Sequence, residues 1–328
     1  MTRSPHVATG ELVAPPTLAG TTFEGFGGTV GVWVTDGEFL DVAEGGLRTE
    51  IAIVDLACSR FREDSWLVAA NTNSGIATCV PTELVEAVTV ALEMAAWTEG
   101  WYDPTVGRAV INAGYDRDFA DIPQDRPEGA GPPAPSGRWR EVIVDPVAST
   151  VTVPPGCSLD LGGSAKGWAA DRAVADIRGV LGDGVGVLVS AGGDLAAAGP
   201  APAGGWTVRL SRSVTDDRSL ADYWFSINEG AVATSGATLR CWRMAGEPAH
   251  HLIDPWTGRP ATSPWRSVTV HADRAVVADV SATVGWLMGR KAPEWLANRG
   301  LSAILVPLFG SPVFVGEALK RPARAVPR

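Results

Sequence analysis

Short β-branched or apolar runs that end in glycine or proline turns recur along this chain, and several follow one another with no helical segment between them. Such runs are typical of strands. They lie at residues 29–35, 48–56, 141–145, 150–153, 185–190, 206–210, 223–227 and 268–271, and residues 300–316 are typical of a C-terminal β-hairpin. Because strands outnumber helices and are often sequential neighbours, the sequence predicts an α+β fold with antiparallel sheets.

Three segments have the apolar spacing of amphipathic helices. The first is 82–98, which begins after Pro81 and ends before Gly100, the usual boundary signals of a helix. The second begins at Lys166, and the third covers 279–288. Residues 122–138 hold a cluster of prolines and glycines, which favours an irregular excursion on the surface.

Composition disfavours several classes of protein. The 328 residues suffice for one large domain or two ordinary ones, and 45% apolar with 20% charged residues is ordinary globular usage. A net charge of −10 disfavours broad electrostatic contact with nucleic acid or an anionic membrane. The cysteines lack C-x-x-C spacing, which argues against a zinc knuckle or disulfide framework and favours buried free thiols at Cys58, Cys79, Cys157 and Cys241.

The sequence also gives an expectation about location. Residues 1–16 contain no apolar core of a secretory or lipoprotein signal. The uncharged stretch 300–316 is interrupted by glycine and proline and is too short to span a membrane comfortably. We therefore expect a cytoplasmic protein with no membrane span.

Residues 160–167 (Asp-Leu-Gly-Gly-Ser-Ala-Lys-Gly) combine an acid at a strand end, a glycine pair and a lysine in the first turn of a helix. Glycine lets backbone N–H groups approach an anion, and a helix N-terminus favours negative charge, so this turn is suited to a phosphate. A Walker A motif is excluded, because Gly167 stands where that motif has its magnesium-binding hydroxyl. Taken alone, the same residues also fit an ordinary tight turn with a surface lysine.

Three further groups combine polar side chains, and each has a structural alternative. Gly192-Gly193-Asp194 fits a tight turn. His250 and His251 precede an Asp-Pro turn, where a histidine can act as a base or simply bond nearby backbone. Asp279 and Thr283 lie four residues apart on one helical face. They suit a hard cation such as magnesium, or equally a helix-capping aspartate and a core threonine.

In this order along the chain, the motifs resemble the ApbE family of FAD:protein FMN transferases. They are Gly27-Gly28-Thr29, Thr234-Ser235-Gly236 and the segments 59–65, 102–107, 160–167, 192–194, 251–258 and 279–283. The resemblance extends from about residue 25 to residue 306. It implies an ApbE-like fold, with antiparallel sheets flanked by helices in one catalytic domain over residues 21–318. Residues 1–20 are then expected to be a disordered N-terminal segment, and 319–328 a C-terminal tail.

The resemblance also implies roles for individual residues. Phe61 stands where the family has an aromatic side chain that packs on the flavin. His251 corresponds to a histidine near the pyrophosphate and is the candidate base, whereas His250 lies outside the motif and is expected to tolerate alanine. The implied FAD contacts are Gly27, Phe61, Trp101, Tyr102, Asp103, Asp160, Lys166 and Leu252. The implied metal ligands are the side chains of Asp279 and Thr283 and the backbone carbonyl of Gly163.

The implied reaction uses FAD as substrate and Mg²⁺ or Mn²⁺ as the metal. FMN passes to a Thr or Ser hydroxyl in an acceptor protein with an FMN-binding domain, and AMP is released. A metal-dependent FAD pyrophosphatase that gives FMN and AMP would use the same residues. A non-catalytic FAD-binding protein is disfavoured by the presence of Asp279 and Thr283, and a flavin oxidoreductase by the lack of a G-x-G-x-x-G fingerprint.

Two features depart from the family pattern. Family members usually carry Met-Gly-Thr at the first motif, where this chain has Gly27-Gly28-Thr29. A contact between this segment and the flavin is therefore lost or supplied elsewhere. Many members work outside the cytoplasmic membrane, whereas no export signal is visible here.

Overall fold

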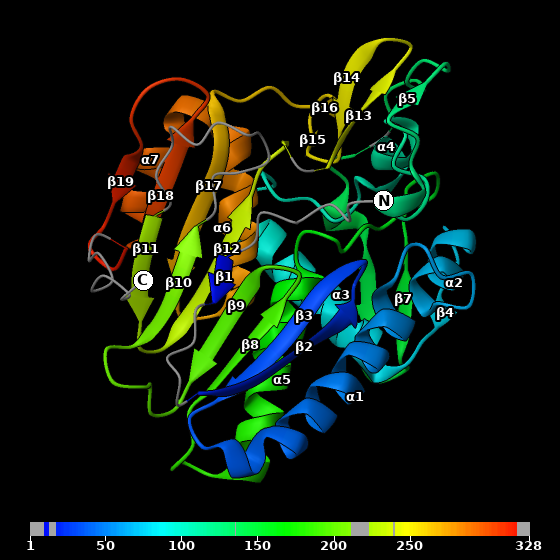
Figure 1. Ribbon diagram of the computed structural model, residues 1–328. Helices are drawn as coiled ribbons and strands as arrows, with labels where there is room; N and C mark the ends of the chain where they lie inside the picture. The colour runs from blue at the N-terminus through cyan, green and yellow to red at the C-terminus, as the bar shows by residue number, and fades with distance from the viewer. Residues whose placement is uncertain (1–9, 13–17, 135, 211–222, 239, 320–328) are drawn as a thin grey trace.

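The computed structural model describes residues 10–12, 18–134, 136–210, 223–238 and 240–319 (Figure 1). Its centre is an antiparallel sheet in which eight strands have the order β19-β18-β17-β12-β9-β8-β3-β2. In chain order these are β2 Ala19–Gly25, β3 Gly28–Val34, β8 Val187–Ala191, β9 Asp194–Ala198, β12 Gly230–Ser235, β17 Trp265–Ala272, β18 Ser302–Pro307 and β19 Val313–Val315. The predicted α+β class with antiparallel sheets is confirmed.

Two tight hairpins of this sheet depend on their turn residues. Phe26 and Gly27 join β2 to β3 with φ angles of 54° and 67°. Gly192 and Gly193 join β8 to β9 with φ angles of 64° and 101°. Positive φ at both central residues matches the right-handed twist of paired strands and favours glycine. The second turn places Asp194 at the first position of β9.

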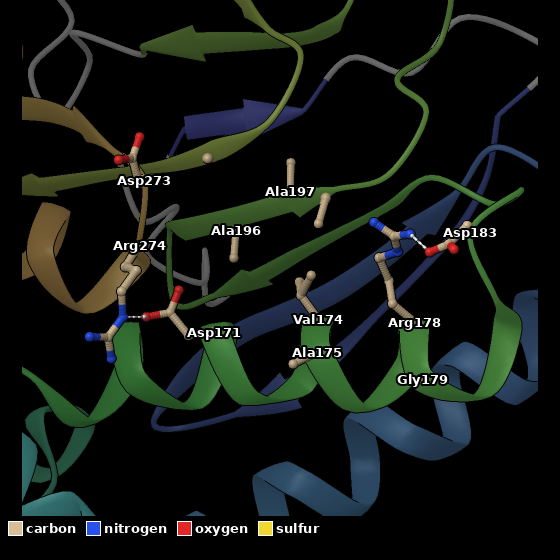
Figure 2. Close-up of a pocket in the computed structure, with 12 residues that line it drawn as sticks. Asp171, Val174, Ala175, Arg178, Gly179, Asp183, Ala196, Ala197, Asp273 and Arg274 are labelled. Atoms are coloured by element: carbon tan, nitrogen blue, oxygen red, sulfur yellow. Dashed lines mark hydrogen bonds and ion pairs between the residues drawn. The ribbon is translucent and has the colours of Figure 1, made fainter.

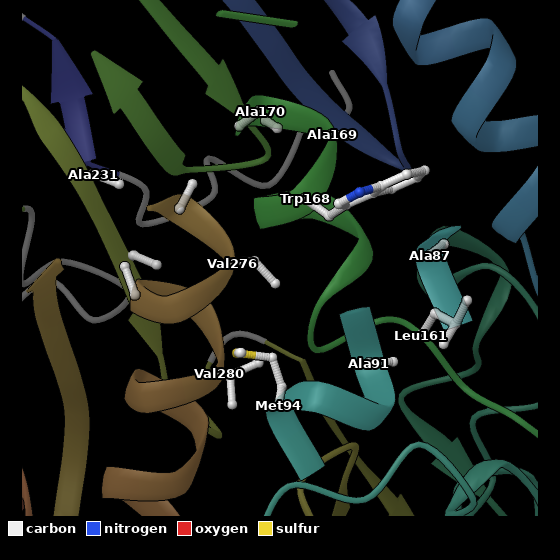
Figure 3. Close-up of a cluster of buried hydrophobic side chains, with 14 of the residues drawn as sticks. Ala87, Ala91, Met94, Leu161, Trp168, Ala169, Ala170, Ala231, Val276 and Val280 are labelled. Atoms are coloured by element: carbon white, nitrogen blue, oxygen red, sulfur yellow. The ribbon is translucent and has the colours of Figure 1, made fainter. Parts of the chain in front are cut away.

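Helices cover one face of the central sheet (Figure 1). α1 packs on β2 and β3, α5 on β8 and β9, and α6 on β12 and β17. Figure 3 shows the apolar core where α3, α5 and α6 meet, with Met94, Trp168 and Val280 among its buried side chains. The helices are α1 Leu40–Cys58, α2 Trp66–Thr72, α3 Thr82–Trp97, α4 Gly107–Asn112, α5 Ala165–Leu181, α6 Ala275–Met288 and α7 Ala292–Asn298.

The opposite face of the sheet carries a second core. Trp206 and Phe225 are fully buried there against Leu188 and Leu195 of the central strands. They come from a small antiparallel sheet that contains β1 Gly10–Leu12, β10 Trp206–Leu210 and β11 Tyr223–Ile227. The molecule is therefore layered as helices, large sheet and small sheet.

The remaining strands are short and form three smaller sheets outside the central one. β5 pairs with β13 in parallel, and the other pairs among them are antiparallel. They are β4 Thr78–Cys79, β5 Asp125–Arg126, β6 Ile143–Asp145, β7 Thr150–Thr152, β13 Cys241–Met244, β14 Glu247–His250, β15 Ile253–Asp254 and β16 Arg259–Pro260. Of the described helices, none is both long and apolar enough to cross a bilayer.

The predicted strand at 48–56 is wrong, because these residues belong to α1. Leu47, Ile51, Val54 and Cys58 are buried at helical spacing and pack the helix onto the sheet. The run of isoleucine and valine favours a strand by local propensity, but burial along one helical face decides the outcome.

Other expectations are confirmed with shifted boundaries. α3 matches the predicted helix at 82–98, and β18 with β19 forms the predicted C-terminal hairpin. α6 begins at Ala275 rather than 279, so Asp279 lies in its second turn and does not cap it. Residues 122–138 are mostly irregular, but Asp125–Arg126 forms β5.

Two expectations need correction, one about the N-terminal segment and one about the cysteines. Gly10–Leu12 pairs with β10, and β2 begins at Ala19, so these parts of 1–20 are ordered strands. Residues 1–9, 13–17 and 320–328 lie outside the described residues. All four thiols are free, as predicted, but those of Cys79 and Cys241 are exposed rather than buried.

Candidate active site

The first turns of α5 and α6 are held against each other. Gly167 allows this approach, because a Cβ there would lie 2.6 Å from the carbonyl oxygen of Ala275. Asp171 of α5 then caps α6, since its carboxylate accepts hydrogen bonds from the N–H groups of Ala275 (2.6 Å) and Val276 (3.1 Å). A carboxylate at a helix N-terminus satisfies free N–H groups and complements the helix dipole. This junction brings Lys166 of α5 close to Asp279 of α6.

Lys166 lies between two buried carboxylates. Its Nζ is 3.2 Å from Asp194 Oδ2 and 3.7 Å from Asp279 Oδ2, and it donates a 3.2 Å hydrogen bond to the carbonyl of Gly162. Asp194 and Asp279 are 4% and 3% exposed. Within the described part of the chain, neither Oδ2 atom accepts a hydrogen bond. Sequence reasoning identified Asp194 as part of a turn, and its place beside Lys166 follows from the β8–β9 hairpin.

The charges of this lysine–carboxylate cluster are unevenly stabilised. Burial raises the pKa of Asp279 to about 7, the charge of Asp194 adds to the rise, and Lys166 opposes it. Burial alone would lower the pKa of Lys166, but the charges of Asp194 and Asp279 raise it above its ordinary value. Two carboxylates that share one ammonium group in a buried place leave negative charge only partly compensated.

The oxygen atoms around Asp279 fit a hard divalent cation. The buried Oδ2 of Asp279 has Lys166 as an ion-pair partner at 3.7 Å but accepts no hydrogen bond from the described residues, so it can take a further partner. Thr283 is one helical turn away, with its hydroxyl 2.9 Å from that of Ser235. Among the described residues no three His, Cys, Asp or Glu side chains gather as a metal site. A cation here would therefore also need hydroxyl and carbonyl oxygens, the ligands that magnesium prefers.

Tyr102 ties the preceding loop to the start of α5. It is 5% exposed, and its hydroxyl lies 2.7 Å from the hydroxyl of Ser164, next to Gly163. Burial raises the pKa of Tyr102 above its ordinary value, so the phenol stays protonated. Its neighbour Trp101 packs edge-on against Trp256, with ring centroids 4.4 Å apart. The structure thus places Tyr102 beside Gly163, and Trp101 beside Trp256.

Asp103 has all its oxygens engaged by the protein. Oδ1 accepts hydrogen bonds from the N–H and hydroxyl of Thr105 at 2.8 and 2.7 Å, and Oδ2 accepts one from the N–H of Gly137. Its side chain is 3% exposed, and burial raises its pKa. These contacts show Asp103 as the anchor of the 136–138 segment.

Aromatic rings and one arginine form a wall beside the Gly162-Gly163 turn. We call the group made of Phe61, Tyr115, Trp242 and Arg60 the aromatic wall. The Tyr115 ring lies 5.3 Å from Phe61 and 5.6 Å from Trp242. Phe61 is 38% exposed, which leaves much of its ring open to contact. Arg60 connects the wall to Asp160, because its Nε is 2.8 Å from Asp160 Oδ2.

The adjacent histidines face different surroundings. His251 Nδ1 is 3.4 Å from the carbonyl of Arg240, and its ring lies edge-on 6.3 Å from Tyr115 of the aromatic wall. Burial lowers the pKa of His251 well below 6.5, and Arg240 lowers it further, so its imidazole is neutral at pH 7. The side chain of His250 instead makes hydrogen bonds to two backbone groups. Its Nε2 is 3.0 Å from the carbonyl of Ala261, and its Nδ1 accepts from the N–H of Leu252.

Gly27 is the expected site residue that lies outside these contacts. Its φ of 67° in the β2–β3 turn favours glycine, and a Cβ there would lie 3.0 Å from the Asp118 carboxylate. The turn geometry thus gives a physical reason for glycine at this position. The described contacts of Gly27 lead to Asp118 rather than to Lys166 or Asp279.

A separate cavity of about 530 Å³ lies further along α5 and β9 (Figure 2). Alanines form much of its lining, and arginines stand at both ends. Arg178 pairs with Asp183 at 2.8 Å and Arg274 with Asp171 at 3.8 Å. Both arginines thus have a carboxylate partner, although the buried Nε of Arg178 has no hydrogen-bond partner among the described residues.

Comparisons with known proteins show the family of this chain. The ApbE family model matches residues 26–305. The FAD:protein FMN transferase of Salmonella typhimurium is 30% identical over 268 residues, which cover 79% of this chain and 75% of that protein. That of Escherichia coli K12 is 28% identical, with 80% and 76% covered.

Solved structures give the same result. The ApbE protein of Thermotoga maritima superposes with a TM-score of 0.78 at 26% identity and covers 94% of this chain and 100% of its own. The flavin transferase ApbE of Vibrio cholerae has a TM-score of 0.72 at 21% identity, covers 93% and 99%, and supports the fold. The chain belongs to the ApbE family and, like its curated relatives, is a transferase.

Proposed function

We propose that this protein is an FAD:protein FMN transferase that binds FAD with a divalent cation, passes FMN to an acceptor hydroxyl and releases AMP. The names of its relatives support the transfer of FMN. The observation that carries the chemistry is the cluster of Lys166, Asp194 and Asp279, buried where the first turns of α5 and α6 meet. Such a place suits a phosphate and its counter-cation.

We assign the phosphate and cation contacts to this cluster and its neighbours. Lys166 and the N–H groups at the start of α5 bind phosphate oxygens. Asp279, Thr283 and the Gly163 carbonyl hold Mg²⁺ or Mn²⁺, and Asp194 orients Lys166. When bound, the cation neutralises charge on the phosphate oxygens.

We assign the proton transfer to His251, which is neutral at pH 7 and therefore able to accept a proton. The acceptor Thr or Ser hydroxyl gives its proton to the imidazole. Its oxygen forms a bond to the phosphorus of the FMN half, and the anhydride bond to the AMP half breaks. AMP leaves with the electron pair of that bond.

The flavin contacts belong to the aromatic wall and the residues near it. Phe61 offers a half-open ring to the isoalloxazine, and an offset aromatic pair adds about 0.5–1.5 kcal/mol beyond area burial. Asp160, Trp101, Tyr102, Asp103, Leu252 and Gly27 complete the proposed FAD site. For Asp103 the proposed role is indirect, through the loop that it anchors.

The decisive experiment incubates the protein with FAD, Mg²⁺ and candidate acceptor proteins that contain an FMN-binding domain. A mass increase equal to a covalent FMN on a Thr or Ser, together with one AMP per FMN, is expected. Asp279→Asn serves as the inactive control. Free FMN and AMP with unmodified acceptor would indicate a pyrophosphatase, and FAD binding without products would indicate a carrier.

A further inference from the structure

We propose that Arg60 is a positioning residue, which fixes the aromatic wall and the Gly162-Gly163 turn in one arrangement for FAD. The proposal rests on the proposed function, because it takes Phe61 and Asp160 as FAD contacts. Arg60 itself is assigned no contact with the substrate.

Arg60 is nearly buried and engaged on several sides. Its side chain is 9% exposed. Nε is 2.8 Å from Asp160 Oδ2, and NH1 donates a 2.5 Å hydrogen bond to the backbone carbonyl of Tyr115. The guanidinium carbon lies 4.4 Å from the Phe61 ring centroid and 4.7 Å from that of Tyr115. One side chain thus contacts two rings, a backbone carbonyl and a carboxylate.

This arrangement gives Phe61 its position. Phe61 lies in the short loop between α1 and α2, and its ring is 38% exposed. A side chain in such a loop loses rotamer freedom when a ligand fixes it, and this entropy loss weakens binding. Packing against Arg60 and Tyr115 restricts the ring before FAD arrives.

Arg60 also contacts the turn that leads into α5, through Asp160. Oδ2 of Asp160 forms an ion pair with Arg60, and Oδ1 accepts a 2.7 Å hydrogen bond from the N–H of Gly162. Rotation of this carboxylate would disturb the turn and the direction of the Gly163 carbonyl. Arg60 therefore links the flavin end of the proposed site to its phosphate end.

Lysine cannot replace these contacts in full. The planar guanidinium stacks on rings while its N–H groups point in fixed directions, whereas an ammonium is a compact charge without a stacking face. Arg60→Lys keeps the charge opposite Asp160 but loses the stack and the geometry of two directed hydrogen bonds. We expect it to recover part of the function that Arg60→Ala loses.

The test measures FAD dissociation constants by quenching of flavin fluorescence, at fixed Mg²⁺, together with melting temperature. Arg60→Ala is expected to weaken FAD binding by about tenfold to a hundredfold, the range for charged hydrogen bonds, and Arg60→Lys by less. Arg62→Ala is the matched control, because Arg62 pairs with Asp55 and Asp64 on the exposed side of the same loop. This control is expected to bind FAD as the unmodified protein does.

A double-mutant cycle separates positioning from general stability. If Arg60 acts through Phe61, Arg60→Ala weakens FAD binding much less in a Phe61→Ala background than in the unmodified protein. The proposal is overturned by an equal loss in the unmodified, Phe61→Ala and Asp160→Asn backgrounds, and by an Arg60→Ala protein that binds FAD as Arg62→Ala does. If Arg60→Ala does not fold, the cycle is run with Arg60→Lys. Failure of the unmodified protein to bind FAD would instead overturn the proposed function.

Discussion

At the scale of single residues, hydrogen-bond partners separate side chains that the sequence presents as equivalent. Burial lowers the pKa of both His250 and His251, yet His250 bonds two backbone groups whereas His251 lies edge-on to Tyr115. The expectation that His250 tolerates alanine is not supported by these contacts, because its loss would leave the Ala261 carbonyl and Leu252 N–H without their partner.

We predict that His251→Ala lowers the rate of FMN transfer by about 10²–10⁴-fold, the usual contribution of a general base. FAD affinity should change only a few-fold, because the residue acts on proton transfer rather than on ground-state binding. Single-turnover kinetics and FAD titrations check both values. His271→Ala on β17 is the control. Unchanged turnover would exclude His251 as the base.

The depressed pKa of His251 gives a prediction about pH. Burial favours the neutral imidazole, and the nearby positive charge of Arg240 and the neighbours His250 and Lys166 act in the same direction. The decline caused by protonation of His251 should therefore lie below pH 6.5. A separate decline near pH 7 is expected from Asp279, whose pKa burial raises to about 7, and Mg²⁺ at saturating concentration should shift that decline to lower pH. Measurement of kcat/KM as a function of pH locates both declines. A decline centred at pH 6.5 that His251→Ala removes would contradict the buried environment.

At the scale of elements, the junction of α5 and α6 organises the proposed site. Spacing alone correctly predicted that Asp279 and Thr283 share one face of a helix, since i and i+4 positions always do. It could not show that Asp194 lies beside Lys166, because that contact depends on how β9 meets α5. For the same reason the sequence did not indicate a positioning role for Arg60. Its partner Tyr115 is 55 residues away in the chain, and its partner Asp160 is farther still.

We predict opposite effects for two glycine substitutions in α5. Gly167→Ala places a Cβ 2.6 Å from a backbone oxygen of α6, so the helices must separate, at a cost of about 1–3 kcal/mol. Gly179→Ala meets no atom within 4 Å and should stabilise the helix by about 1 kcal/mol. Thermal and urea unfolding measure both changes. Equal stability of the two variants would show that the helix junction tolerates separation.

At the scale of the whole molecule, the family fold could be identified from motif order, whereas the strand register could not. The glycine turns and apolar runs predicted many strands, but α1 shows that β-branched composition misleads where a helix buries one face. Outside the three hairpins of the central sheet, the pairings join segments far apart in the chain, such as β3 with β8 and β12 with β17, and local sequence does not specify such partners.

The site brings together α5, α6 and the start of β9, so we predict that cation and FAD bind cooperatively. Mg²⁺ should bind weakly alone and more tightly with FAD, and FAD affinity should rise with Mg²⁺ by the same factor. Calorimetric titrations measure both constants. Asp279→Ala should remove the coupling, whereas Asp183→Ala, at a fully exposed carboxylate, should keep it. FAD affinity that is independent of Mg²⁺ would refute a shared site.

The pairing of β3 with β8 has a consequence during protein synthesis. At the end of this pair, the Gly186 N–H bonds the Thr35 hydroxyl across 151 residues of sequence. At about 5–20 residues per second, the ribosome takes roughly 8–30 s to reach β8 after β3 has been made. Throughout this interval β3 has an open hydrogen-bonding edge and the apolar side chains of Val30, Val32 and Val34. Until β8 has been made, this edge of β3 therefore lacks the strand that covers it in the folded sheet.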